Sequence, residues 1–236
     1  MTMVSDPRRP WILAIDTGTS EIVVAAGGLD GSVIAASREP ADFRHGELLL
    51  ATIERLMEET GLGRGSLRAI VVGTGPGAFT GLRVGLATAK TLAHAFEVPL
   101  FGVGTAAALI RAAARSAEGP SVAERDVVLL LPAGPRERVI VRDGMAPRIL
   151  AEEGELATID SSRLVAVDLD TRAPDPAIAR GAAARGMLAA TLMEIGAARL
   201  RSGQADDPAL LVPDYVTLPR GIRASTGAIE WSNDPR

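Results

Sequence analysis

The chain reads GTGPGAFTGLRVG over residues 73–85. A short apolar run, residues 69–72, precedes this stretch, and an alanine-rich run that ends near Phe96 follows it. The pattern predicts a strand, a glycine turn and a helix over residues 81–96. Such a junction can serve two purposes. Free N–H groups at a helix N-terminus can hold an anion, and small residues on the helix can let another helix approach closely.

Composition limits the classes of protein to consider. The chain has 236 residues, of which 47% are hydrophobic, a formal net charge of -4 and no cysteine. A sizeable core is therefore expected, with no general attraction for nucleic acid and no thiolate chemistry or disulfides. Residues 1–10 lack the apolar core of a signal peptide, and no apolar run is long enough to span a membrane. We expect a soluble, cytoplasmic protein without membrane contact.

The first half of the chain predicts a three-stranded meander followed by alternating helices and strands. A hairpin signal, Asp30-Gly31, separates the second and third strands. The predicted strands are residues 11–16, 21–28, 32–38, 69–72 and 99–103. The predicted helices are residues 44–60, 81–96 and 105–115.

The second half repeats the opening faintly after a linker at residues 116–124. When the two halves are aligned with Leu13 opposite Leu129, Glu21 falls opposite Glu137. This correspondence indicates a weak internal repeat. The predicted strands here are residues 127–131, 148–151 and 164–167, and a long helix is predicted over residues 175–200. We therefore divide the chain into a disordered N-terminus at 1–10, a first lobe at 11–115, a second, degenerate lobe at 116–223 and a flexible tail at 224–236.

Two related strand-strand-strand-helix lobes resemble the α/β plan of the actin, Hsp70 and sugar-kinase superfamily. In that superfamily each lobe opens with an acidic hairpin that grips nucleotide phosphate and its metal. Asp16, Thr17, Gly18 and Thr19 fit this pattern, whereas the second lobe has Pro132 in place of the acid. Proline also removes an N–H donor. This difference disfavours a self-sufficient kinase or ATPase.

Four segments resemble the TsaB (YeaZ) family of the bacterial threonylcarbamoyladenosine tRNA-modification pathway. They are residues 12–17, His45, residues 75–90 and residues 213–216. The resemblance is strong over about residues 11–115 and weak afterwards. The chain departs from the family at Ala78 and at Gly46, where serine is usual, and near Pro132, where an acid is usual.

The resemblance implies a non-catalytic subunit with no catalytic or metal-binding residues of its own. Members of this family pair with a TsaD-like catalytic subunit, and a TsaE-like ATPase joins the assembly. They can also form homodimers through the same surface and meet tRNA only indirectly. No cofactor of its own is expected, so that ATP or ADP with Mg²⁺ would bind, if at all, at a partner interface.

The alanine-rich helix carries the residues that we expect at that interface. Gly81, Gly85 and Ala89 recur every four residues and so line one helix face. Small residues there would allow close helix packing on a partner; the alternative is that the face packs on its own sheet. The predicted interface is His45, Leu49, Gly81, Leu82, Arg83, Gly85, Leu86 and Ala89.

The glycine turn itself is expected to be structural. Pro76-Gly77 after Gly75 fits the central pair of a type II turn, and Thr80 is placed to cap the following helix. A phosphate-binding P-loop would need Lys and then Ser or Thr after the last glycine, where this chain has Leu82-Arg83.

Asp16 with Thr17, Gly18 and Thr19 is the best candidate for a nucleotide site, because a carboxylate beside turn N–H groups can bind Mg²⁺ and phosphate. The alternative is an aspartate that bonds its own turn. His45 and His94 are too far apart in sequence for a recognisable metal motif. The arginines at 180, 185, 199, 201, 220 and 223 are expected on solvated surfaces rather than in a tRNA-binding strip.

Three other functions stay open. A small actin-like ATP-binding enzyme would use Asp16 and need a second acid opposite. A glycoprotease-like hydrolase is disfavoured because the chain has no Gly-x-Ser-x-Gly elbow. A plain homodimeric scaffold would differ from a TsaB-like subunit only in its partner.

Overall fold

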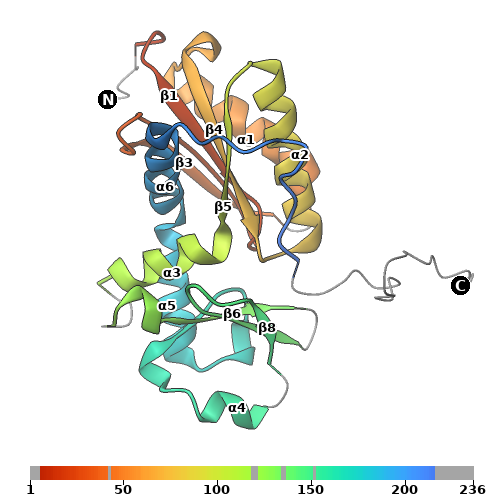
Figure 1. Cartoon of the computed structure of the whole chain (residues 1–236), viewed down its shortest axis with the longest axis vertical. Helices are drawn as coiled ribbons and strands as arrows, with labels where there is room; N and C mark the ends of the chain where they lie inside the picture. Colours follow the sequence, from red (N-terminus) through yellow and green to blue (C-terminus); the bar gives the residue numbers. More distant parts are fainter. Residues whose placement is uncertain (1–5, 42–43, 118–121, 134–136, 151–152, 216–236) are drawn as a thin grey trace, which may run out of the picture.

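The structure is a computed structural model that describes residues 6–41, 44–117, 122–133, 137–150 and 153–215. It has two lobes arranged along the long axis of the molecule, with α3 (Thr105–Arg115) at the junction between them (Figure 1). The two-lobed α/β plan predicted from the sequence is confirmed.

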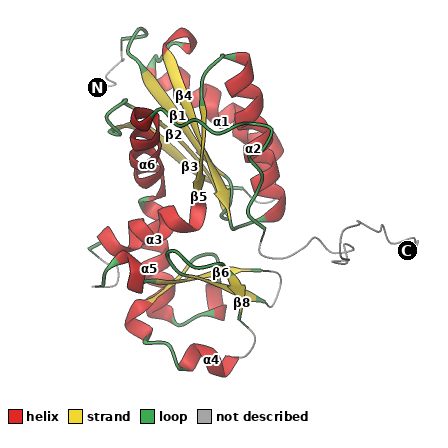
Figure 2. Ribbon diagram, viewed as in Figure 1, coloured by secondary structure: helices red, strands yellow, loops and turns green. Residues whose placement is uncertain are grey.

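The first lobe is built on a five-stranded sheet in the order β3-β2-β1-β4-β5 (Figure 2). The first three strands form the predicted antiparallel meander, and β4 runs parallel to β1 and β5. The strands are β1 (Trp11–Asp16), β2 (Glu21–Gly27), β3 (Val33–Pro40), β4 (Leu67–Gly75) and β5 (Leu100–Gly104).

Helices cover both faces of this sheet. On one face lie α1 (His45–Thr60) and α2 (Phe79–Ala95), and on the other lies α6 (Leu188–Ser202). The side chains of β1 alternate between the two faces of the sheet. Leu13 and Ile15 belong to the hydrophobic cluster under α1 and α2, whereas Ile12 and Ala14 belong to the cluster under α6. Burial on both faces explains why β1 reads as a continuous apolar run.

The second lobe repeats the topology of the first, in the order β8-β7-β6-β9. Leu13 pairs with Ile70 of the parallel neighbour, and Leu129 likewise pairs with Val165. The strands are β6 (Val128–Pro132), β7 (Arg138–Val141), β8 (Arg148–Ile149) and β9 (Leu164–Ala166), with α4 (Glu153–Ala157) between the last two. The internal repeat is therefore real. Short 3-10 turns lie at Arg64–Ser66, Glu124–Asp126, Ser161–Arg163 and Asp170–Arg172.

The long helix predicted over residues 175–200 is two helices, α5 (Asp175–Gly186) and α6, which are separated at Met187. Helix α5 packs on β9 of the second lobe, but α6 crosses back to cover the first sheet. The predicted lobe boundaries are wrong in this respect, because residues 188–202 belong to the first lobe. The apolar face of the first sheet that lies opposite α1 and α2 needs α6 to shield it from water.

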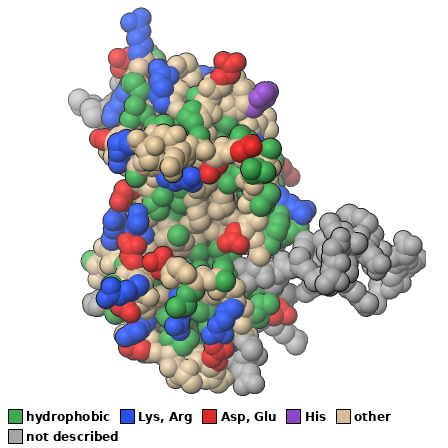
Figure 3. All heavy atoms as spheres, in the orientation of Figure 1, with side chains coloured by type: hydrophobic (Ala, Val, Ile, Leu, Met, Phe, Trp, Pro, Cys, Tyr) green, Lys and Arg blue, Asp and Glu red, His purple; other side chains and the backbone are tan. Residues whose placement is uncertain are grey.

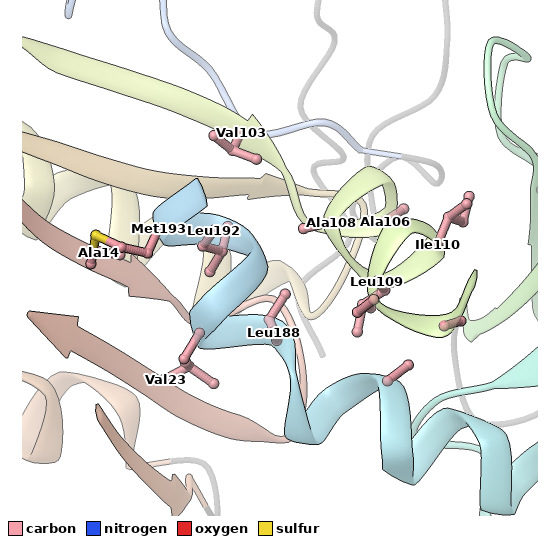
Figure 4. Close-up of a cluster of buried hydrophobic side chains, with 14 of the residues drawn as sticks. Ala14, Val23, Val103, Ala106, Ala108, Leu109, Ile110, Leu188, Leu192 and Met193 are labelled. Atoms are coloured by element: carbon pink, nitrogen blue, oxygen red, sulfur yellow. The ribbon is translucent and has the colours of Figure 1, made fainter. Parts of the chain in front are cut away.

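One hydrophobic core joins the lobes. Figure 4 shows Ala14 and Val23 of the first sheet beside Leu192 and Met193 of α6, with Leu109 of α3 nearby. The same cluster includes residues of β6, β7 and β9.

The chain after α6 crosses back over the first lobe and shields the edge of β5. The Asp206 N–H donates to the Leu100 carbonyl at 2.9 Å, and its carboxylate accepts from Gly102 N–H at 2.6 Å. An exposed strand edge is a site of unwanted pairing, which this contact blocks.

The other end of the chain is partly ordered by the fold. The Pro7 carbonyl accepts from Ser66 Oγ at 2.7 Å, so the prediction that residues 1–10 lack fixed structure is wrong for this part. The predicted tail at 224–236 lies outside the described residues. None of the helices described has the length and apolar character that crossing a bilayer requires.

Candidate functional site

The turn between β1 and β2 holds Asp16 at the centre of the first lobe. The carboxylate accepts hydrogen bonds from Gly18 N–H at 2.8 Å and from Thr105 Oγ1 at 2.6 Å. It is fully buried, and a Cβ at Gly73 would overlap with it, so β4 needs glycine there. Burial raises the pKa of Asp16 to about 6, although both hydrogen bonds oppose the rise.

This arrangement brings together the residues predicted for a nucleotide site, Asp16, Thr17, Gly18 and Thr19, but engages them within the chain. Thr17 Oγ1 donates to the Gly81 carbonyl at 2.7 Å, and Gly18 contributes its N–H to Asp16. Both threonines are buried. The local interactions are thus those of a structural turn, although the oxygen donor set of one carboxylate and two hydroxyls is of the kind that hard cations prefer.

The glycine turn packs directly on that hairpin. Ala78 N–H donates to the Gly18 carbonyl at 2.8 Å, and a Cβ at Gly77 would overlap with the same carbonyl. The type II turn predicted at Pro76-Gly77 is wrong, because the left-handed residue is Gly75, with φ +102°, and the Gly75–Pro76 peptide bond is cis. Close approach of the two backbones therefore dictates the glycines.

The predicted cap is also wrong. Helix α2 begins at Phe79 with Ala78 as its N-cap, and no side chain caps it. Thr80 lies in the first helical turn and is exposed.

The small-residue face of α2 is buried inside its own chain. A Cβ at Gly81 would overlap with the Thr17 carbonyl, and one at Gly85 would overlap with Thr17 Oγ1. The interface prediction is wrong for Gly81, Leu82, Gly85, Leu86, Ala89, His45 and Leu49, all of which are buried here. The small size of Gly81 and Gly85 serves close packing on the β1–β2 hairpin.

The side chain of His45, in the first turn of α1, is buried inside the chain beside Gly81. Its side chain is 7% exposed, and its Nε2 lies 3.0 Å from where a Cβ of Gly81 would stand. Burial lowers the pKa of His45, with partial opposition from the Thr19 backbone. The second histidine, His94, is exposed on α2.

Arg83 is the predicted interface residue that the structure leaves exposed. Its guanidinium lies 3.9 Å from the centroid of the Phe79 ring and donates to Tyr215 Oη at 2.9 Å. The two rings are 4.9 Å apart. This cation–π cluster ties the segment after α6 to the start of α2.

An apolar groove that the sequence pattern did not single out lies between α1 and α2, and residues of β1 and β4 are part of its lining. Its volume is about 320 Å³, and it is lined by Trp11, Leu13, Leu50, Ile53, Glu54, Met57, Arg64, Leu67, Leu92 and Phe96. Leu50 stands out because 52% of its surface is exposed.

Asp168 is the site residue that the sequence reasoning missed. Pro132 ends β6 as expected, but the carboxylate of Asp168, just beyond β9, reaches the first-lobe hairpin and accepts from Ser20 N–H at 2.7 Å. Its charge also contributes to raising the pKa of Asp16. An acid directly after an apolar strand, Val167-Asp168, was the available signal.

The arginines of α5 and α6 are engaged within the chain, and Arg180, Arg185 and Arg199 are half-buried, so the prediction of a solvated surface is wrong for these three. Figure 3 shows Lys and Arg side chains interspersed with Asp and Glu on the visible face. The contacts are Arg180 to the Leu164 carbonyl, Arg185 to Asp168, Arg199 to Asp206 and Arg201 to the Leu29 carbonyl. Arg220 and Arg223 lie outside the described residues. Among those described, no cluster of three or more His, Asp or Glu side chains suits a metal ion.

A family model and curated proteins of tRNA threonylcarbamoyladenosine formation both match this chain. A family model described as TsaD, tRNA N6-adenosine threonylcarbamoyltransferase, matches residues 38–199. The tRNA threonylcarbamoyladenosine biosynthesis protein TsaB of Escherichia coli is 37% identical over 94 residues, which cover 40% of each chain. The TsaB protein of Bacillus subtilis is 33% identical over 94 residues, covering 40% of this chain and 41% of that protein.

Two further similarities concern an uncharacterized protein and the fold. An uncharacterized protein of Mycobacterium tuberculosis is 38% identical over 93 residues, covering 39% of this chain and 44% of that protein. The chain thus matches less than half the length of these curated relatives. The structure of YeaZ from Pseudomonas aeruginosa matches with a TM-score of 0.63 and 22% identity, covering 87% of this chain and 99% of that one.

Proposed function

This chain belongs to the TsaD family of tRNA N6-adenosine threonylcarbamoyltransferases, and from this membership we propose that it serves threonylcarbamoyladenosine formation as a TsaB-type, non-catalytic partner subunit. Its likeness to the TsaB proteins of Escherichia coli and Bacillus subtilis supports this role. We propose that it binds a TsaD-like catalytic subunit, that a TsaE-like ATPase joins the assembly, and that tRNA is met only through these partners.

The groove between α1 and α2 is the observation that carries the partner role. Both helices already bury their inner faces on the sheet, and the deeper lining residues Trp11, Leu13 and Leu67 belong to that core. Leu50 does not belong to it and is 52% exposed, so it is not needed for that packing. Apolar surface of this kind in a concave site favours a protein partner. A standard interface buries roughly 800 Å² per partner, which a pair of helices of this length can supply.

Charge favours a helical pair as the occupant. Exposed residues of α1 include Glu47, Glu54 and Glu58, and its exposed Arg55 is already paired with Glu39. On α2, Arg83 is exposed and Lys90 is half-buried. A partner with the same arrangement, related by a two-fold axis, would place acids against bases. A second copy of this chain fits this description, and we propose that the TsaD-like subunit binds the same surface, so that the two would compete for it.

The test is binding of the purified chain to the TsaD-like protein of the same organism. Leu50→Arg places a charge in the apolar groove, so we expect affinity to fall at least about tenfold, as a buried unpaired charge costs more than 1.4 kcal/mol. Leu210→Arg is the matched control, because Leu210 is 77% exposed and does not line the groove. Undiminished binding of Leu50→Arg would exclude this groove as the interface.

The proposal assigns no cofactor to the isolated chain. Both carboxylate oxygens of Asp16 accept hydrogen bonds within the chain. ATP or ADP with Mg²⁺ would therefore bind, if at all, at a surface completed by a partner. The isolated chain should transfer no threonylcarbamoyl group.

A small ATP-binding enzyme is the second candidate, and one observation favours it. The second acid that such an enzyme needs is present, since the charge of Asp168 acts on Asp16 from the other lobe. ATP turnover by the isolated chain, abolished by Asp16→Asn, would support this candidate against the partner role.

A further inference from the structure

The carboxylate of Asp168 is bound by three donors at the junction of the lobes. Ser20 N–H donates to Oδ2 at 2.7 Å, and Ser20 Oγ donates to Oδ1 at 2.6 Å. Arg185 Nη1 of α5 also donates to Oδ1, at 2.6 Å. Ser20 lies on the first-lobe hairpin, whereas Asp168 and Arg185 lie on the second lobe. These contacts therefore fasten one lobe to the other.

The donor set is that of an oxyanion site. A backbone N–H at a turn, a hydroxyl and a guanidinium are the groups with which proteins bind carboxylate and phosphate, and charge-assisted bonds of this kind are the strong ones. Arg185 Nη1 also donates to Ser20 Oγ at 3.0 Å, which aligns the hydroxyl with the same anion. The three donors converge on one carboxylate.

The surrounding charges hold the guanidinium in place. Arg185 Nε lies 3.6 Å from Glu21, which in turn pairs with Arg38 at 3.0 Å. Arg172 Nη2 donates to the Asp168 carbonyl at 3.2 Å. The Asp168 side chain is 12% exposed and Arg185 24%, so the contact is only partly screened by water.

The backbone at Asp168 supports a specific placement of its side chain. Asp168 has φ +57°, a left-handed conformation that is uncommon for residues other than glycine but tolerated by aspartate. Such conformations persist where the surrounding contacts maintain them.

We propose that Asp168 is an internal ligand that occupies an oxyanion site formed by Ser20 and Arg185, holds the lobes together and excludes inorganic phosphate and phosphate esters from the hairpin. Removal of this carboxylate would leave its donors free for an external oxyanion. The inference does not depend on the partner proposed above.

The test uses the full chain and inorganic phosphate, with the Ser20 amide resonance as the reporter. Asp168→Gly removes the carboxylate and relieves the left-handed backbone, since glycine adopts positive φ freely. We expect phosphate to shift the Ser20 amide saturably in Asp168→Gly and at least about tenfold more weakly in the wild type, the loss that corresponds to one charge-assisted bond. Sodium chloride at equal ionic strength corrects for screening.

Two controls define the site. Asp143→Ala removes an exposed second-lobe aspartate and should behave as the wild type. Asp168→Gly combined with Ser20→Ala should lose phosphate binding, because a donor is missing. Equal binding by the wild type and Asp168→Gly, or none by Asp168→Gly, overturns the proposal.

A measurement on the wild type guards against a variant that fails to fold. The hydrogen bond to Asp168 should protect the Ser20 amide from hydrogen exchange at least about tenfold relative to a free turn amide, since exchange requires this bond to open. An unprotected Ser20 amide would overturn the proposal without any substitution.

Discussion

At the scale of single residues, Asp16 links stability to pH. Burial raises its pKa from 3.8 to about 6 in the folded protein. The folded state therefore binds this proton more tightly than the unfolded chain. The resulting stabilisation is complete below pH 3.8 and is lost as pH rises through about 6.

We predict that Asp16→Asn removes this pH dependence, because the amide carries no charge at any pH. A hundredfold change in proton affinity is worth about 3 kcal/mol, so the free energy of unfolding of the wild type should fall relative to the variant by up to about 3 kcal/mol between about pH 4 and pH 8. Urea denaturation across this range measures the difference. Parallel stability curves for the two proteins would contradict the assignment.

At the scale of elements, α2 is held by close backbone contact with the β1–β2 hairpin, and glycine makes that contact possible. A Cβ at Gly85 would overlap with Thr17 Oγ1, whereas a Cβ at Gly46 of α1 would meet nothing within 4 Å. The two helical glycines therefore offer a matched pair that differs in packing.

We predict that Gly85→Ala lowers the free energy of unfolding by about 1–3 kcal/mol through overpacking. Gly46→Ala should raise it by about 0.5 kcal/mol, because alanine loses less backbone entropy in a helix. Thermal and urea unfolding of both variants measure these effects. A gain in stability from Gly85→Ala would show that α2 can move away from the hairpin at little cost.

At the scale of the whole molecule, the two lobes form one cooperative unit. The shared core includes residues of both sheets, α3 and α6, and α6 covers the first sheet although it follows the second lobe in sequence. Division of the chain at residue 115 would expose the apolar face that carries Ala14 and Val23.

We predict that a fragment of residues 1–115 does not fold alone, since α6 is missing. Its amide spectrum should show the poor dispersion of an unfolded chain, and addition of a fragment of residues 116–236 should restore native dispersion. The full chain should unfold in a single calorimetric transition with equal van't Hoff and calorimetric enthalpies. A dispersed spectrum of the first fragment alone would contradict this prediction.

Much of the candidate site could be predicted from the sequence, because the residues that mark its turns are close together in the chain. Turn chemistry at Asp16 and the run of glycines from Gly73 identified the hairpin and the strand-to-helix junction. Gly81 and Gly85 were recognised as a close-contact face, but periodicity could not say whether the contacting surface was Thr17 of the same chain or a partner.

The order of strands and helices in the first half, the weak repeat of the two halves and the family resemblance followed from the sequence alone, because hydrophobic periodicity and turn residues act over a few neighbouring positions. The break between α5 and α6 at Met187 and the short helix α4 did not. Only the tertiary structure decided that α6 returns to the first sheet, that the small face of α2 is buried on the hairpin, and that Asp168 reaches Ser20 across 148 residues. These outcomes depend on which apolar faces and charges meet in space, and sequence separation carries no information about that.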